Sequence, residues 1–88
     1  MRVDGVSTVR ITVYSRSGCH LCEEMRDVAA TVAAETGAAF DEVDVDADPA
    51  IAARYDLEVP VLCIDGVKAF SIRVSPALLR ERVRREMR

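Results

Sequence analysis

The sequence contains no tryptophan, and aromatic residues make up only 5% of its 88 positions. Aliphatic side chains must therefore fill any hydrophobic core. A chain of this length buries one modest core, so we expect residues 1–88 to form a single compact domain. We therefore do not expect a large multidomain enzyme.

Long hydrophobic runs are also missing. Arg10, Arg16, Asp65 and Arg73 interrupt every stretch that approaches the roughly 20 residues of a membrane span. Residues 1–17 carry charges where a signal peptide would need a continuous apolar segment. We therefore expect a cytoplasmic protein without membrane contact, and we expect it to be a monomer.

Cysteine is scarce, with three residues. An odd number cannot pair completely, and a reducing cytosol opens ordinary bridges, so no structural disulfide framework is expected. The net charge is -3, and acidic residues concentrate at 41–58. Arginines gather in residues 80–88, where they suit the negative end of a helix dipole, so we expect no nucleic-acid partner.

Hydrophobic periodicity predicts seven short elements. Alternating apolar residues indicate strands, and apolar residues three and four positions apart indicate helices. Gly37 ends the first helix, while Asp48-Pro49 and Ser75-Pro76 open the other two. The predicted elements are strands at 9–14, 40–45, 61–64 and 67–74, and helices at 20–36, 49–55 and from 76 onward.

This order predicts an α/β domain. A right-handed crossover through the first helix makes the first two strands parallel, and a hairpin at Asp65-Gly66 adds an antiparallel edge. We expect a mixed four-stranded sheet (βαβαββα) with helices on both faces. Four residues of the last helix are expected on its apolar side: Leu78, Leu79, Val83 and Met87.

The sequence Cys19-His20-Leu21-Cys22 lies where the first strand meets the first helix. Unpaired N–H groups and the helix dipole favour a thiolate at Cys19. Cys22, one turn further along, can reach Cys19 to form a disulfide but is sheltered by the helix. This placement predicts an exposed attacking sulfur and a sheltered resolving sulfur.

Residues 13–22, which end in this motif, resemble the active-site entry of glutaredoxin-like proteins, and residues 43–60 resemble the central part of the thioredoxin superfamily. The resemblance covers residues 9–86 and implies a thioredoxin-like fold. It also implies a cis peptide bond before Pro60, opposite the cysteines, with Val59 and Pro60 binding a peptide or thiol substrate. Arg16 matches a basic residue that binds a glutathione carboxylate in glutaredoxins.

Other positions depart from both families. Thioredoxins have a tryptophan before the first cysteine, where Gly18 lies here, and glutaredoxins have a Gly-Gly pair where Phe70-Ser71 lies here. We therefore expect weak glutathione affinity. The most similar group is the small glutaredoxin-like group with C-x-L-C followed by glutamate, which Cys22-Glu23 fits.

The resemblance and the motif together predict a thiol-disulfide oxidoreductase with Cys19 and Cys22 as catalytic residues. His20 and Arg16 are candidates for tuning the Cys19 pKa, and the alternative for an exposed His20 is that it has no effect on that pKa. Expected partners are a disulfide-containing protein or a small thiol, with a reductase or a low-molecular-weight thiol as electron donor. We expect no bound cofactor, and glutathione is a candidate co-substrate.

Two alternatives stay open. In the first, Cys19 and Cys22 hold a metal ion or an iron-sulfur cluster, which needs four ligands. Only His20 and Cys63 remain as further ligands, and strand alternation predicts that Cys63 is an inert buried thiol. The second alternative is a redox-inert interaction domain that keeps the fold.

Overall fold

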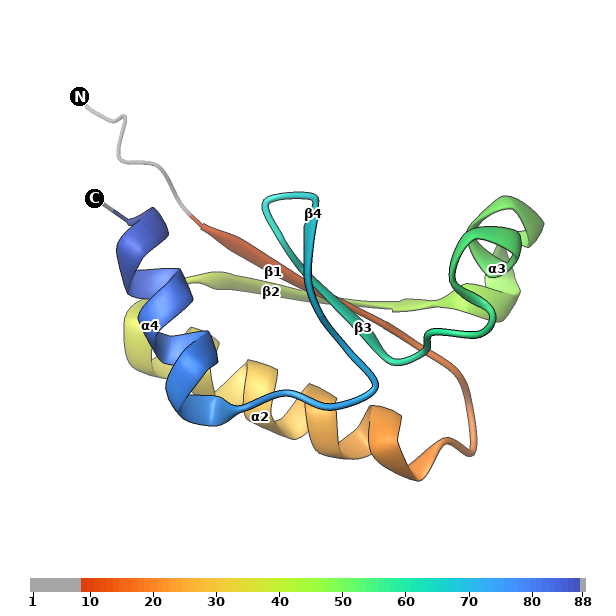
Figure 1. The fold of residues 1–88 in the computed structure, drawn as a ribbon, viewed down its shortest axis with the longest axis horizontal. Helices are drawn as coiled ribbons and strands as arrows, with labels where there is room; N and C mark the ends of the chain where they lie inside the picture. The colour runs from red at the N-terminus through yellow and green to blue at the C-terminus, as the bar shows by residue number, and fades with distance from the viewer. Residues whose placement is uncertain (1–8, 88) are drawn as a thin grey trace.

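A computed structural model describes residues 9–87 of the chain, and its elements follow the predicted order (Figure 1). They are β1 Arg10–Ser15, α2 His20–Thr36, β2 Ala39–Asp44, the 3-10 helix η1 Val45–Ala47, α3 Pro49–Tyr55, β3 Val61–Ile64, β4 Val67–Ser71 and α4 Pro76–Glu86. The predicted α/β order is confirmed. Among the described residues, no helix has the length and apolar character needed to cross a membrane.

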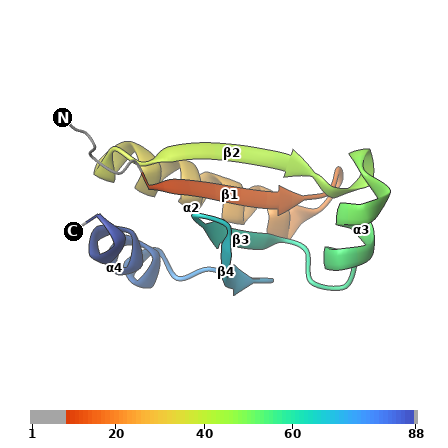
Figure 2. The ribbon, with the colours of Figure 1, turned by 90° about the horizontal axis from the view of Figure 1, so that it is seen from above.

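The strands form one mixed sheet in the order β2-β1-β3-β4 (Figure 2). β1 pairs in parallel with β2 and antiparallel with β3, and β4 completes the hairpin with β3. At one end of the sheet, Ser15 is paired with Asp44 and Tyr14 with Val61. The last residues of β1 and β2 and the first residues of β3 therefore meet at one end of the sheet. The chain leaves β1 at this end and runs toward Cys19.

Helices cover both faces of the sheet, as predicted, but unequally. α2 and α4 lie on one face of the sheet (Figure 1). They form the main core with it, and Ile11, Met25, Leu62 and Leu79 are fully buried there. Fully burying such side chains contributes about 1.5–3 kcal/mol each. This face therefore carries most of the hydrophobic stabilisation.

α3 covers only one end of the opposite face. Its last residue, Tyr55, packs with Val45, Val61 and Cys63 in a second and smaller cluster. The Tyr14 ring lies against the Tyr55 ring, with centroids 4.7 Å apart. This cluster holds α3 and η1 at the end of the sheet where β1 ends.

The predicted helix ends are confirmed. The Asp48 side chain accepts a hydrogen bond from the Ala50 N–H at the start of α3, and the Ser75 side chain accepts one from the Leu78 N–H at the start of α4. Gly37 ends α2 with φ of 81°, a left-handed conformation that costs glycine little. Local side-chain chemistry alone accounts for these boundaries.

The predicted end of the second strand is wrong. Val45 begins η1 instead of continuing β2. The Asp44 carboxylate accepts a hydrogen bond from the Asp46 N–H at 2.9 Å, and this local bond turns the backbone out of the sheet.

Two predictions near the C-terminus are also wrong. β4 ends at Ser71 instead of residue 74, because Ile72 has φ of 70° and so cannot continue an extended strand. Leu78 is 54% exposed, because it lies one position off the buried stripe that carries Leu79 and Val83 at a spacing of four.

Candidate active site

The loop after β1 sets the first cysteine at the start of α2. Gly18 has φ of 76°, which lets the chain turn sharply into the helix. Cys19 is the N-cap residue, and its Sγ accepts a hydrogen bond from the Cys22 N–H at 3.1 Å. The Cys19 sulfur thus faces N–H groups of the first turn, an environment that stabilises a thiolate.

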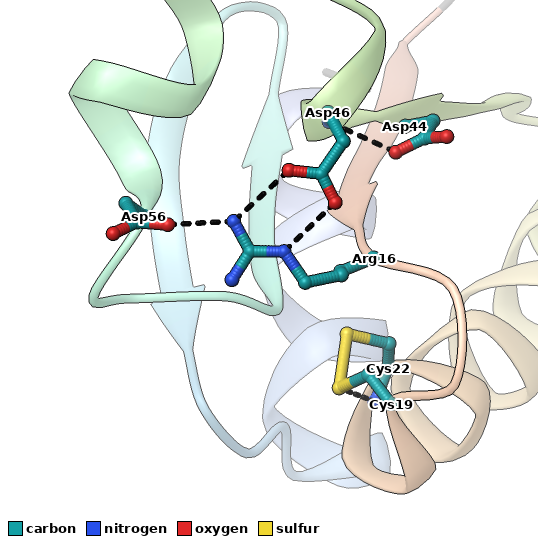
Figure 3. A network of polar contacts seen from close by, with 6 residues as sticks. All are labelled: Arg16, Cys19, Cys22, Asp44, Asp46 and Asp56. Atoms are coloured by element: carbon teal, nitrogen blue, oxygen red, sulfur yellow. Dashed lines mark hydrogen bonds and ion pairs between the residues drawn. A yellow bond between two sulfur atoms is a disulfide. The ribbon is translucent and has the colours of Figure 1, made fainter.

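Cys19 and Cys22 form a disulfide, and their Cα atoms lie 5.2 Å apart (Figure 3). Cys19 is half-buried, whereas Cys22 is only 2% exposed. The predicted difference between an outer and an inner sulfur is therefore present. A reactant from solvent reaches Cys19 more easily than Cys22.

His20 is on the exposed side of the first turn of α2. Its side chain is 83% exposed, and its Nε2 lies 2.9 Å from the Glu24 carboxylate one turn along the helix. Protonated His20 is therefore paired with Glu24. An effect of His20 on the Cys19 pKa stays a prediction.

Arg16 is held by two carboxylates of this chain (Figure 3). Its Nε and one terminal nitrogen donate to Asp46 at 3.0 and 3.2 Å, and the same terminal nitrogen donates to Asp56 at 2.6 Å. These hydrogen bonds, with Asp46 the larger cause, raise the pKa of Arg16. The guanidinium points to the aspartates instead of toward the sulfur atoms, so a substrate carboxylate would compete with both of them.

The peptide bond between Val59 and Pro60 is cis, as the resemblance implies. Pro60 is fully buried, and its carbonyl accepts a hydrogen bond from the Ile72 N–H at 2.8 Å. It directly precedes β3, whose first residue Val61 pairs with Tyr14. Pro60 therefore lies at the end of the sheet where the loop that carries the cysteines begins. Substrate binding by Val59 and Pro60 stays a prediction.

A pocket of about 290 Å³ lies beside the cysteine motif. At its wall the Ser15 hydroxyl donates to the Glu42 carboxylate at 2.8 Å, although Ser15 is only 6% exposed. Sequence reasoning missed this pair, and it also missed Asp46 and Asp56 as partners of Arg16. The one available signal was the concentration of acidic residues at 41–58, which does not say which of them meets Arg16.

The sequence family described as Glutaredoxin-like domain (DUF836) matches residues 10–88. The chain belongs to this glutaredoxin-like family. The match covers every element described above, including the cysteine motif and the cis peptide bond. The glutaredoxin-like resemblance in the sequence is thus confirmed.

Solved structures similar to this glutaredoxin-like chain share its fold. Structural genomics target protein XcR50 from X. campestris is 29% identical, with a TM-score of 0.70 over 85% of this chain and 96% of that one. A mutant thioredoxin from Halobacterium salinarum is 26% identical, with a TM-score of 0.68 over 97% of this chain and 82% of that one. Protein Ne2328 from Nitrosomonas europaea is 23% identical, with a TM-score of 0.73 over 93% and 98% of the two chains.

These neighbours confirm the predicted thioredoxin-like fold of the glutaredoxin-like chain. No curated protein matches its sequence. A thioredoxin-like fold with Cys19 and Cys22 at disulfide distance supports a thiol-disulfide redox role in general.

The third cysteine of the glutaredoxin-like chain, Cys63, is buried at the middle of β3. It is 1% exposed and is not part of the disulfide. The Cys63 sulfur lies 4.0 Å from the Tyr55 hydroxyl. Burial of the Tyr55 hydroxyl is the main cause that raises the pKa of Tyr55, and the neighbouring Cys63 thiol raises it further. Within residues 9–87, no three side chains of His, Cys, Asp or Glu gather as they would around a metal ion.

Because Cys63 is buried, we expect its thiol to be unreactive in the folded protein. After reduction, iodoacetamide is expected to alkylate Cys19 under native conditions and to reach Cys63 only in denaturant. Peptide mass spectrometry after native and denaturing alkylation measures this difference. Alkylation of Cys63 at the rate of Cys19 under native conditions would contradict its burial.

Proposed function

We propose that this protein is a thiol-disulfide oxidoreductase that uses a Cys19-Cys22 dithiol/disulfide couple. The observation that carries the proposal is the position of the pair: Cys19 is the half-buried N-cap residue of α2, and Cys22, one turn further along, is only 2% exposed. An accessible sulfur beside a sheltered partner is the arrangement that a two-step exchange reaction requires.

In the reduced protein, the Cys19 thiolate attacks one sulfur of a substrate disulfide. A Cys19-substrate disulfide forms, the substrate bond breaks, and the departing thiolate takes up a proton. The Cys22 thiolate then attacks the Cys19 sulfur and releases the second substrate thiol. The substrate gains two electrons, and the protein is left with the Cys19-Cys22 disulfide.

The N-terminus of α2 supports the first step, because its N–H groups and dipole stabilise the Cys19 thiolate. The hydrogen bond from the Cys22 N–H to Cys19 Sγ is one such contact. Glu23 in the same turn opposes it electrostatically. The balance of these two effects sets how oxidising the pair is.

The proposal includes a source of electrons for the next cycle. Either two equivalents of a low-molecular-weight thiol or a reductase would restore the two thiols, and a cytoplasmic location would supply both. A disulfide-containing protein or a small disulfide is the proposed substrate.

Equilibration of the protein in a series of glutathione redox buffers, followed by alkylation and intact-mass measurement, tests the proposal. We expect one transition in which the protein loses two alkylatable thiols, Cys19 and Cys22, and keeps Cys63. A stable adduct of glutathione mass would contradict the resolving role of Cys22. If neither species formed across the series, the redox function would be wrong.

A further inference from the structure

Charged side chains surround the pocket beside the disulfide. Three carboxylates and two guanidinium groups line it together with Cys22 and small residues of the loop. The charged residues are Arg16, Glu23, Arg26, Glu42 and Asp44. The pocket reaches the disulfide at Cys22, and a thiol that attacks the neighbouring Cys19 sulfur comes within range of both signs of charge. The pairing among these charged groups decides which sign dominates.

Both guanidinium groups already have carboxylate partners. Arg16 is bonded to Asp46 and Asp56, neither of which is among the residues that line the pocket. Arg26 lies 3.6 Å from the Asp27 carboxylate and 3.9 Å from that of Glu42. Arg16 is thus offset by aspartates outside the pocket, and Arg26 by Asp27 and by Glu42, which itself lines the pocket. Three carboxylates and two guanidinium groups line the pocket and three further aspartates pair with those guanidinium groups, so the described residues present a net negative charge to a reactant.

We propose that Asp46 and Asp56 determine the charge specificity of the disulfide exchange, so that the oxidised protein reacts faster with cationic thiols than with anionic ones. The two aspartates act by holding the Arg16 guanidinium, which would otherwise attract an anionic thiol beside Cys19. The inference rests on the proposed function, because it concerns the choice of thiol in that same reaction.

The step at which charge acts is the attack of a small thiolate on the Cys19 sulfur. A mixed disulfide forms between Cys19 and the small thiol, the Cys19-Cys22 bond breaks, and Cys22 leaves as a thiolate that takes up a proton. A second molecule of thiol then attacks the mixed disulfide, which gives the small disulfide and free Cys19. An ammonium group on the attacking thiol is attracted by the pocket carboxylates, and a carboxylate on it is repelled.

The aspartates can be changed without loss of the fold. The side chains of Asp46 and Asp56 are 53% and 56% exposed, and exposed ion pairs contribute at most about 1 kcal/mol to stability. Asparagine keeps the shape of each side chain and removes its charge. The variant Asp46→Asn with Asp56→Asn therefore removes both carboxylate counter-charges of Arg16 while leaving the cysteines in place.

Stopped-flow reduction of the oxidised protein by three matched thiols tests the proposal: cysteamine, 2-mercaptoethanol and 3-mercaptopropionate. For each thiol, the rate constant of the double variant is divided by that of the native protein, so that intrinsic thiol reactivity cancels. Each thiol attacks as its thiolate, so the attacking species has no net charge for cysteamine, one negative charge for 2-mercaptoethanol and two for 3-mercaptopropionate. At low salt we expect about a three- to tenfold rise for 3-mercaptopropionate and a smaller rise for 2-mercaptoethanol. Cysteamine should change by less than about twofold, and high salt should shrink the other two effects.

The matched control is Glu35→Gln with Asp41→Asn. It removes the same charge and two exposed carboxylate partners of arginine, those of Arg80 and Arg10. Glu35 lies in the last turn of α2, and Arg10 is the first residue of β1, at the opposite end of that strand from the cysteine loop. Little change is expected with any of the three thiols. Equal changes in both double variants, or one uniform factor for all three thiols, would overturn the proposal, since net charge or altered structure would then explain the result.

The same experiment separates this inference from the proposed function. If the native protein reacts with 2-mercaptoethanol but shows no charge-dependent change in the Asp46→Asn, Asp56→Asn variant, the charge specificity is wrong and the redox function stands. If the oxidised native protein reacts with none of the thiols, the redox function itself fails.

Discussion

Replacing Cys19 with serine is expected to abolish thiol-disulfide exchange, with a loss of at least about a hundredfold in rate. Serine keeps the N-cap hydrogen bond, because its hydroxyl can accept from the residue 22 N–H as the sulfur does. The helix should therefore form normally while the nucleophile is missing. Reduction of a small fluorescent disulfide by the pre-reduced protein measures the effect.

The Cys22→Ser variant is the matched control for this prediction. It leaves Cys19 able to attack, but the mixed disulfide has no resolving thiol and should accumulate as a stable adduct visible by intact mass. Cys63, at 1% exposure, is too buried to replace Cys22. Full activity of the Cys19→Ser variant would refute the mechanism, and so would full turnover of Cys22→Ser without any adduct.

Truncating Leu79 to alanine is expected to lower the free energy of unfolding by about 2–5 kcal/mol. Leu79 is fully buried in the main core, where α4 packs with α2 against the sheet. The cavity left by the lost methyl groups cannot refill easily in a close-packed interior. Urea denaturation followed by circular dichroism measures the change, which is a large part of the stability of a domain of this size.

Leu78→Ala is the control for this prediction, because it makes the same substitution one position earlier on the same helix. Leu78 is 54% exposed, so its truncation should change stability by no more than about 0.5 kcal/mol. Helix propensity changes equally in the two variants, and the difference between them isolates burial. Similar stability losses in both would contradict the packing of α4 described here.

The sequence predicted most of the fold because the responsible signals are local. Hydrophobic spacing located the helix at residues 20–36, and the capping residues Asp48 and Ser75 located the starts of the two later helices. The strand order followed from general rules for crossovers and hairpins. These predictions need no knowledge of distant contacts, and the structure confirms them.

The predictions failed where a local bond or a tertiary contact changed the pattern. Val45 looks like the continuation of an alternating strand, but the Asp44 carboxylate turns the backbone first. Leu78 looks like part of the apolar face of α4, but the direction in which α4 packs leaves it in solvent. Hydrophobicity alone does not give the angle at which a helix meets a sheet.

The candidate site divides in the same way. By itself the sequence determined that Cys19 and Cys22 lie one helical turn apart at a strand-helix junction, because that spacing is local and short. Only the tertiary structure decided that Arg16 meets Asp46 and Asp56, which are 30 and 40 residues away in the sequence. The small cluster around Tyr55 and Val45 brings α3 and η1 to the end of β1, and this long-range packing selects which of many acidic residues reach Arg16.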